Sequence, residues 1–129
     1  MTGLPGRPVA GAVEIGTVSG ATRQVHLTVS PNEPVFAGHY PGFPVFPGVC
    51  LLDFVYRGAL AVVPEPERPW RLDAVEKARF LKPVLPGDRL TADLGWQRRE
   101  AGWRCAAAVS TARGTVAHIR ISLAEGRST

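Results

Sequence analysis

The sequence has few of the features that mark membrane, secreted and metal-binding proteins. No apolar run approaches the roughly 18 residues of a membrane-spanning helix, and residues 1–11 lack the charged and then apolar pattern of a signal peptide. The two cysteines, Cys50 and Cys105, lie in apolar runs without CxxC or Cys/His spacing, so we expect buried free thiols and no metal site. We therefore expect a cytoplasmic protein that does not associate with a membrane.

Clustered positive charge is also missing, although the net charge is +4. The densest basic cluster, Arg98 and Arg99, is followed directly by Glu100, and no basic stripe alternates with aromatic residues. This pattern argues against a nucleic-acid-binding protein. A mildly basic surface suits an acidic protein partner instead, because complementary charge steers the encounter.

The chain contains several segments in which apolar and polar residues alternate. They predict strands over residues 23–29, 89–96, 103–111 and 115–123, and a mixed pattern predicts another over residues 69–81. Short turns at residues 100–102 and 113–114 require antiparallel pairing. We expect one domain over residues 1–129, with a flexible N-terminal segment at 1–12 and a flexible tail at 125–129.

One segment predicts a substantial helix. From Val49 to Val63 nearly every side chain is apolar, so we expect this helix to be buried on most sides. Pro47 suits its first turn, and Pro64 and Pro66 end it. A buried helix with five or six antiparallel strands predicts an α+β fold in which the sheet curls around the helix.

The apolar helix contains one acid, Asp53. A carboxylate without compensation is costly in an apolar site. Asp53 therefore either points to the rim or pairs with Arg57 one turn later, or it keeps its proton and acts as an acid at neutral pH.

A proline- and glycine-rich loop with one histidine precedes the helix. Residues 38–48 contain three prolines and three glycines, a composition that fits a rigid loop holding the imidazole of His39 in place. The alternative is a solvated surface histidine. The buried acid that follows favours a functional role for His39.

Two motifs resemble those of the β-hydroxyacyl-acyl-carrier-protein dehydratases of the FabZ/FabA type. The segment "FAGHYPGFPVFPGVCLLD", residues 36–53, is similar to the family's active-site pattern H-F-P-G-x-P-V-M-P-G-V followed by an acid. The segment "VEKARFLKPVLPGDRL", residues 75–90, resembles its second signature, D-K-x-x-F-x-x-P-V-x-P-G-D. With the strands that follow, the resemblance covers residues 13–124.

The resemblance implies a hotdog fold, with an antiparallel sheet wrapped around a long central helix. It also implies a dimer, homomeric or with a paralogous hotdog subunit, in which each site combines the loop histidine of one subunit with the helix acid of the other. In this comparison His39 is the base, Asp53 the acid and Gly48 a backbone N–H donor, while the carbonyl of Val45 holds the other nitrogen of His39. The substrate would be a 3-hydroxyacyl thioester on the phosphopantetheine arm of acyl carrier protein, with no further cofactor. Its tunnel would be lined by Phe43, Phe46 and Phe80.

Two points of the sequence leave alternatives open. The acid is Asp, as in the branch that also isomerises its product, whereas the second signature resembles the branch that carries Glu. Arg57 stands where the family commonly has Gln; we expect it to reach the surface, or to meet the carrier protein or the phosphopantetheine phosphate, rather than to pair with Asp53. These departures suggest a specialised paralogue, in fatty-acid or in polyene-forming type II polyketide synthesis. The other candidates are a hotdog thioesterase, which needs no loop histidine, and a non-catalytic subunit that completes a partner's site.

Overall fold

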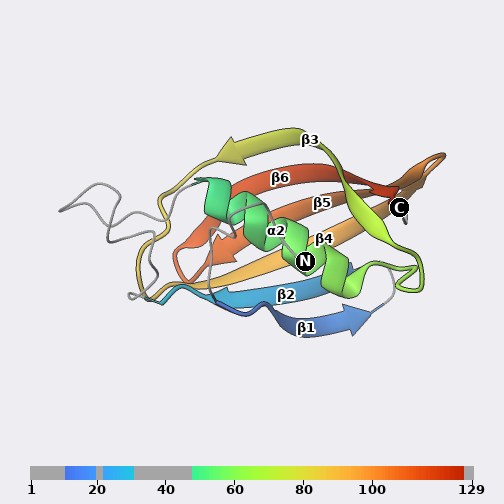
Figure 1. Ribbon diagram of the computed structural model, residues 1–129. Coiled ribbons are helices and arrows are strands. Elements are labelled where there is room, and N and C mark those ends of the chain that lie inside the picture. Colours follow the sequence, from blue (N-terminus) through green and yellow to red (C-terminus); the bar gives the residue numbers. More distant parts are fainter. Residues whose placement is uncertain (1–10, 20–21, 31–47, 127–129) are drawn as a thin grey trace.

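Six strands form one antiparallel sheet in the order β1-β2-β4-β5-β6-β3, and helix α2 lies across one of its faces (Figure 1). The structure is a computed structural model and describes residues 11–19, 22–30 and 48–126. Its elements are β1 (Glu14–Ser19), β2 (Thr22–Thr28), α2 (Gly48–Val62), β3 (Trp70–Phe80), β4 (Arg89–Arg99), β5 (Gly102–Thr111) and β6 (Gly114–Glu125). This architecture confirms the expected hotdog fold.

The core lies between α2 and the inner face of the sheet. Each strand predicted by strict alternation turns its expected apolar face inward, because successive side chains of a strand point to opposite faces. The strand residues buried there include Val25, Leu27, Leu90, Leu94, Cys105, Val109, Ile119, Ile121 and Leu123. The predicted turns join β4 to β5 and β5 to β6, and Gly114 adopts the positive φ of 107° that the second turn requires.

Helix α2 is buried on most of its surface, as its all-round apolar sequence predicts. It ends at Val62, two residues before Pro64, and the side chain of Arg23 on β2 donates to the carbonyl of Val62 at this end. Gly58 allows the helix to lie directly on β2, since an added Cβ there would come within 2.5 Å of Cγ2 of Val25. The close approach of helix and sheet therefore depends on a missing side chain.

Strand β3 explains the mixed pattern of residues 69–81. It is an edge strand that pairs with β6, and its register shifts between Leu72 and Ala74 and again between Val75 and Lys77. Each irregularity adds a residue to β3 and reverses the face to which the following side chains point. Alternation is therefore interrupted twice, and most of the strand is exposed.

Strand β1 at the opposite edge was not predicted. Its apolar residues Ile15 and Val18 are 58% and 50% exposed, so they are not packed into the core on the inner face of the sheet. Gly16 interrupts the strand pattern for a structural reason, because a Cβ there would collide with the His26 ring on β2. An edge strand of this kind leaves little periodicity in the sequence.

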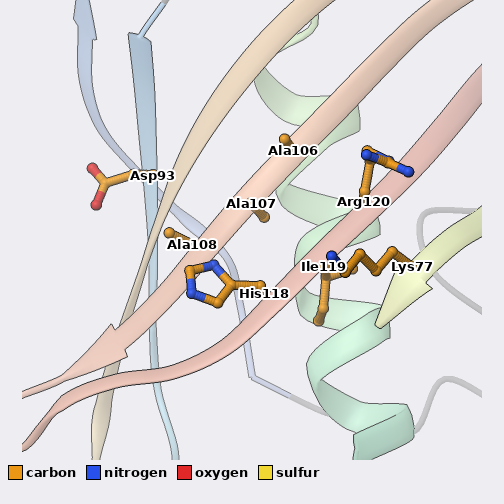
Figure 2. Close-up of a pocket in the computed structure, with 8 residues that line it drawn as sticks. All are labelled: Lys77, Asp93, Ala106, Ala107, Ala108, His118, Ile119 and Arg120. Atoms are coloured by element: carbon orange, nitrogen blue, oxygen red, sulfur yellow. The ribbon is translucent and has the colours of Figure 1, made fainter. Parts of the chain in front are cut away.

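The outer face of the sheet, opposite α2, contains a shallow groove of about 300 Å3 (Figure 2). Ala106 and Ala108 of β5 form its floor, and Asp93, His118, Arg120 and Lys77 lie around them. The groove lies on the other side of the sheet from Asp53, so it is separate from the predicted site.

The ends of the described chain differ slightly from the expected boundaries. Strand β6 continues to Glu125, whose carboxylate accepts a hydrogen bond from Arg68 at 2.7 Å, and the N–H of Gly126 bonds to the carbonyl of Pro69. Ordered contacts therefore extend into the segment that we expected to be a tail. The described part of the chain has no helix with the length and apolar character needed to cross a bilayer.

Candidate active site

The side chain of Asp53 lies inside the core, in the second turn of α2. It has no exposed surface, and it is accompanied by Arg57, 6% exposed, as the other buried charged residue of the described chain. The helix brings the two together because residues four apart lie on one face. The alternative in which Asp53 points to the rim is therefore wrong, whereas the alternative in which Asp53 pairs with Arg57 is the one that the structure shows.

Arg57 is not where we expected it. Its side chain is 5% exposed, so it neither extends to the surface nor presents a free guanidinium to a carrier protein. Nη1 lies 3.5 Å from Oδ2 of Asp53, and Nη2 donates to the carbonyl of Gly11 at 2.6 Å. Arg57 turns inward to these partners because it is buried, and a guanidinium enclosed by the core must have its N–H groups hydrogen-bonded inside the protein.

The N-terminus of α2 is covered by an aromatic ring. A Cβ added at Gly48 would lie 2.9 Å from Cζ of Phe80, which means that the Phe80 ring packs directly over this glycine. The first N–H groups of a helix have no partner within the helix and carry partial positive charge. The structure therefore brings together two predicted site residues, Gly48 and Phe80, at the end of the helix that suits a developing negative charge.

The second sequence signature forms a braced turn between β3 and β4. Asp88 accepts hydrogen bonds from the N–H of Leu85 and from both terminal nitrogens of Arg113 at 2.8 and 2.6 Å. This contact with Arg113 is the main reason that the pKa of Asp88 is lowered. Gly87, with φ of 89°, donates to the carbonyl of Val29 just after β2. The turn thus fixes the chain at the start of the segment that carries His39.

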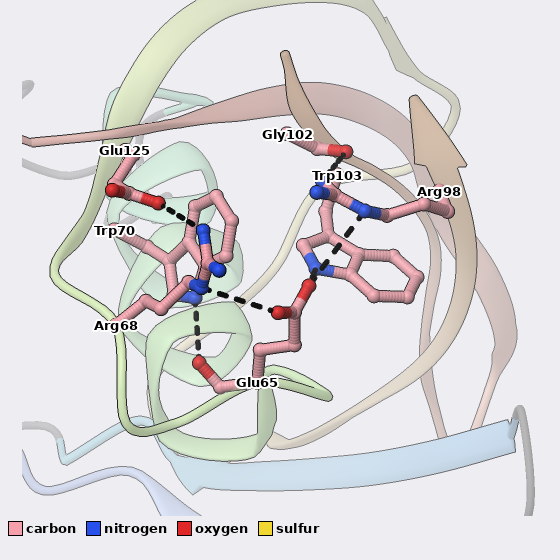
Figure 3. Close-up of polar contacts among 7 residues, drawn as sticks. All are labelled: Glu65, Arg68, Trp70, Arg98, Gly102, Trp103 and Glu125. Carbon is pink, nitrogen blue, oxygen red and sulfur yellow. Dashed lines mark hydrogen bonds and ion pairs between the residues drawn. The ribbon is translucent and has the colours of Figure 1, made fainter. Parts of the chain in front are cut away.

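A polar and aromatic cluster holds the chain beyond the other end of α2 (Figure 3). The carboxylate of Glu65 accepts from Nε1 of Trp103 at 3.0 Å, while its backbone carbonyl accepts from Nε1 of Trp70 at 2.7 Å. The guanidinium of Arg98 lies over the rings of Trp70 and Trp103 at 6.0 and 5.5 Å. These contacts tie the segment after the helix to β3, β4 and β5, and so help to fix the position of the helix.

Four predicted site residues, His39, Phe43, Val45 and Phe46, lie outside the described residues. The proximity of His39 to Asp53 therefore stays a prediction. Within the described ranges, no group of three or more histidine, cysteine or acidic side chains is arranged to hold a metal ion.

Both cysteines are buried free thiols, as the sequence predicts. Burial raises the pKa of the Cys105 thiol to about 12. A thiol in this environment is not a nucleophile at neutral pH, because the thiolate is the reactive form. Cys105 is therefore a core residue and not part of the chemistry.

The chain resembles dehydratases in sequence. A family model described as ApeI-like, the ApeI dehydratase, matches residues 16–118. A 3-hydroxyacyl-[acyl-carrier-protein] dehydratase FabZ from Symbiobacterium thermophilum is 49% identical over 70 residues, which are 51% of this chain and 49% of the relative. A FabZ from Polynucleobacter necessarius is 39% identical over 93 residues, 69% of this chain and 62% of the relative. The chain thus spans about half to three-fifths of the length of the curated relatives it matches.

The fold comparison agrees with the sequence comparison. The dehydratase heterocomplex ApeI:P from Xenorhabdus doucetiae contains a chain with a TM-score of 0.69 and 21% identity, and the match covers 91% of this chain and 98% of that one. At this identity the likeness concerns the fold alone. The family match covers most of the chain, including α2 with Asp53 and the turn with Asp88, and the chain belongs to the ApeI-like dehydratase family.

Proposed function

We propose that the protein is a dehydratase that removes water from a 3-hydroxyacyl thioester and releases a trans-2-enoyl thioester. The observation that carries this proposal is the fully buried carboxyl group of Asp53 in the second turn of the central helix. A carboxyl group shielded from water by an apolar helix is suited to proton transfer rather than to solvation. The family to which the chain belongs supports the same reaction.

The reaction divides between a base and an acid. The neutral imidazole of His39 removes a proton from C2, and the electrons of that C–H bond form the C2–C3 double bond. The C3–O bond breaks, and Asp53 gives its proton to the departing hydroxide, which leaves as water. Negative charge that develops on the thioester oxygen is stabilised by the backbone N–H of Gly48 and by the helix N-terminus behind it.

Arg57 has a positioning role in this scheme. Its short hydrogen bond goes to the carbonyl of Gly11 at 2.6 Å, and its distance to Oδ2 of Asp53 is 3.5 Å. The guanidinium is thus anchored on the chain before β1, and the longer contact limits the rotation of the carboxyl group. Arg57 touches Asp53 from the following turn of the helix, whereas the substrate would approach from the N-terminal end.

A second hotdog subunit would complete the site. Strand β3 lies at the edge of the sheet and exposes Val75 and Phe80, 43% and 48% accessible, so it offers unpaired backbone and apolar side chains to another chain. The ApeI:P structure is a dehydratase heterocomplex, which supports a paralogous partner, and a homodimer would satisfy the same edge. In either assembly His39 of one subunit faces the acid of the other.

The substrate would arrive on acyl carrier protein, in fatty-acid or polyene-forming type II polyketide synthesis. The phosphopantetheine arm of the carrier presents the thioester, so the reaction needs no cofactor bound to the enzyme. Phe80 at the helix N-terminus provides an apolar wall for the acyl chain, together with Phe43 and Phe46 from the preceding loop, while the carbonyl of Val45 holds the other ring nitrogen of His39.

The proposal is tested by incubating the protein with a series of 3-hydroxyacyl carrier-protein thioesters and following the products by mass spectrometry. We expect loss of one water from the acyl chain, and we expect His39→Ala and Asp53→Asn each to slow the reaction by about 100- to 10,000-fold while the circular dichroism spectrum is unchanged. Release of a free acid would indicate a thioesterase instead. No turnover without a paralogous partner, and turnover with that partner after both substitutions, would indicate a non-catalytic subunit.

A further inference from the structure

The outer face of the sheet has an unusual distribution of side chains around the groove of Figure 2. The two outward positions at its centre are alanines, Ala106 and Ala108, where a solvated strand normally carries longer polar side chains. Asp93 lies on the β4 side of these alanines, and His118, Arg120 and Lys77 lie on the β6 and β3 side. A flat apolar centre is thus bordered by an acid on one side and by basic residues on the other.

The strand register aligns these residues in two rows across the sheet. Asp93 pairs with Ala108, which pairs with His118. Gly95 pairs with Ala106, which pairs with Arg120, and a Cβ at Gly95 would have no neighbour closer than 3.8 Å. Each row therefore has a small residue on β5, and Gly95 leaves open space on the β4 side at the level of Arg120.

We propose that this outer face binds the same face of a second copy of the chain, around a twofold axis parallel to β5. Such an axis exchanges the β4 side with the β6 side, so that Asp93 of each copy lies opposite His118 of the other. His118 can donate a hydrogen bond to a carboxylate from either of its ring nitrogens. Arg120 of each copy lies opposite Gly95 of the other, where no side chain obstructs it, and the alanines of the two β5 strands meet at the centre.

The charges of this face favour a second copy over an acidic protein. Glu76 forms ion pairs with Arg104 at 2.7 Å and with Arg120 at 3.3 Å, so this carboxylate offsets part of the positive charge on the β6 and β3 side and leaves that side basic. Asp93 would repel an acidic partner. A surface whose two halves carry opposite charges is instead complementary to itself, and small central residues permit the close approach of two stacked sheets.

This contact is independent of the proposed dehydration. The groove lies on the face of the sheet away from α2, and the pairing of another subunit along β3 leaves the outer face free. Two edge-paired dimers could therefore join through it. Changes on the outer face should alter the assembly and leave the chemistry at Asp53 intact.

The first test is the mass of the full chain in solution, measured by light scattering during size-exclusion chromatography. We expect Ala108→Arg to halve the mass of the wild-type assembly, because two long cations would meet at the centre of the contact. Circular dichroism checks that this outward-facing substitution leaves the fold intact. Glu100→Lys in the exposed turn between β4 and β5 is the control and should keep the wild-type mass. An unchanged mass for Ala108→Arg would overturn the proposal.

A charge exchange identifies the proposed pair. Asp93→Lys and His118→Asp should each weaken the association at least about tenfold, because each places like or unpaired groups opposite one another. The double substitution restores opposite charges and should return the assembly toward the wild-type mass. If the loss of association in the double variant equalled the sum of the losses in the two single variants, Asp93 and His118 would not face each other across the contact.

Discussion

The side chains of Asp53 and Arg57 form a buried pair on one face of α2. The guanidinium lies in the core with the acid, and its second contact is a backbone carbonyl of a segment 46 residues away. A buried charged group of this kind is tolerated where its N–H groups have partners inside the protein, as they do here at Asp53 and at the carbonyl of Gly11. Its removal leaves the acid without that contact.

The first prediction is that Arg57→Ala lowers the free energy of unfolding by about 3 kcal/mol, since the substitution removes the hydrogen bonds that the buried guanidinium donates to Asp53 and to the carbonyl of Gly11. Urea denaturation measures the effect. Arg99→Ala, at an exposed position of β4, is the control and should change stability by less than about 0.5 kcal/mol. Equal effects of the two substitutions would mean that the Arg57 contacts contribute little to stability.

The second prediction concerns the thiols. With a pKa of about 12, Cys105 has a negligible thiolate fraction at pH 8, and both cysteines are inaccessible. We expect neither to react with a disulfide reagent within an hour in the native protein, and both to react at once in guanidinium chloride. Rapid modification of one thiol in the native state would contradict the burial of that residue.

At the level of elements, the position of α2 on the sheet determines where Asp53 lies. Gly58 permits contact with Val25 of β2, Arg23 caps the end of the helix, and Glu65 secures the segment that follows it. The first two contacts join the helix to β2, and the third joins the segment after the helix to β5. A single added methyl group between the helix and β2 should therefore lower the stability of the protein measurably.

The third prediction is that Gly58→Ala destabilises the protein by about 1–3 kcal/mol, because the new Cβ would come within 2.5 Å of Val25 and force the helix away from β2. We also expect the activity to fall, because the shifted helix carries Asp53. Gly95→Ala is the matched control: its Cβ has no neighbour closer than 3.8 Å, and stability should be kept or improved. If Gly58→Ala left the free energy of unfolding unchanged, the helix and β2 would be able to separate without loss of stability.

The fourth prediction uses the braced turn after β3. The pKa of Asp88 is lowered mainly by its hydrogen bonds from Arg113, so the folded state binds its proton less readily than the unfolded chain does. Its stabilising contribution is complete above the ordinary aspartate value of 3.8 and is lost as the pH falls through the lower folded value. Asp88→Asn should therefore be less stable than the wild type at pH 7, and the difference should shrink below pH 3.8. A constant difference across this range would exclude the ionised carboxylate as its source.

On the scale of the whole molecule, the two edges of the sheet differ in what they offer to a partner. β3 is eleven residues long with exposed Val75 and Phe80, whereas β1 is a six-residue strand that contains an irregularity of its own. Both edge strands contain irregularities, so the difference lies in their length, and a short edge strand discourages pairing with another chain. The proposed partner subunit is therefore expected to pair along β3.

The fifth prediction is that Val75→Glu lowers the mass of the assembly and the dehydratase activity together, because the two-subunit site would be lost with the edge contact. Ile15→Glu makes the same chemical change on the exposed opposite edge and should affect neither. Outer-face substitutions such as Ala108→Arg should lower the mass and keep the activity. A monomeric Val75→Glu protein with full activity would exclude a site shared between subunits.

Sequence reasoning located most of the fold where one physical signal dominates. The alternation of β2, β4, β5 and β6 predicted both the strands and their inner faces, because each of these strands has one face on the core. The edge strands gave weak signals, since Ile15 and Val18 are exposed and β3 changes face at two irregularities. Burial on one side of a strand is what leaves a periodic pattern in a sequence.

For the candidate site, the sequence by itself determined the family and singled out Asp53 as the one acid of an apolar helix, while the structure decided that Asp53 is buried and that Arg113 braces the turn at Asp88. Local spacing and motif residues suffice for the family and for the choice of Asp53. Only the tertiary structure decided that Arg57 turns inward to Gly11, that Phe80 covers Gly48 and that the outer face gathers Asp93, Ala108 and His118 into one row. These contacts join residues between 10 and 46 positions apart, and their distances are determined by how the helix and strands pack, which no local pattern of side chains encodes.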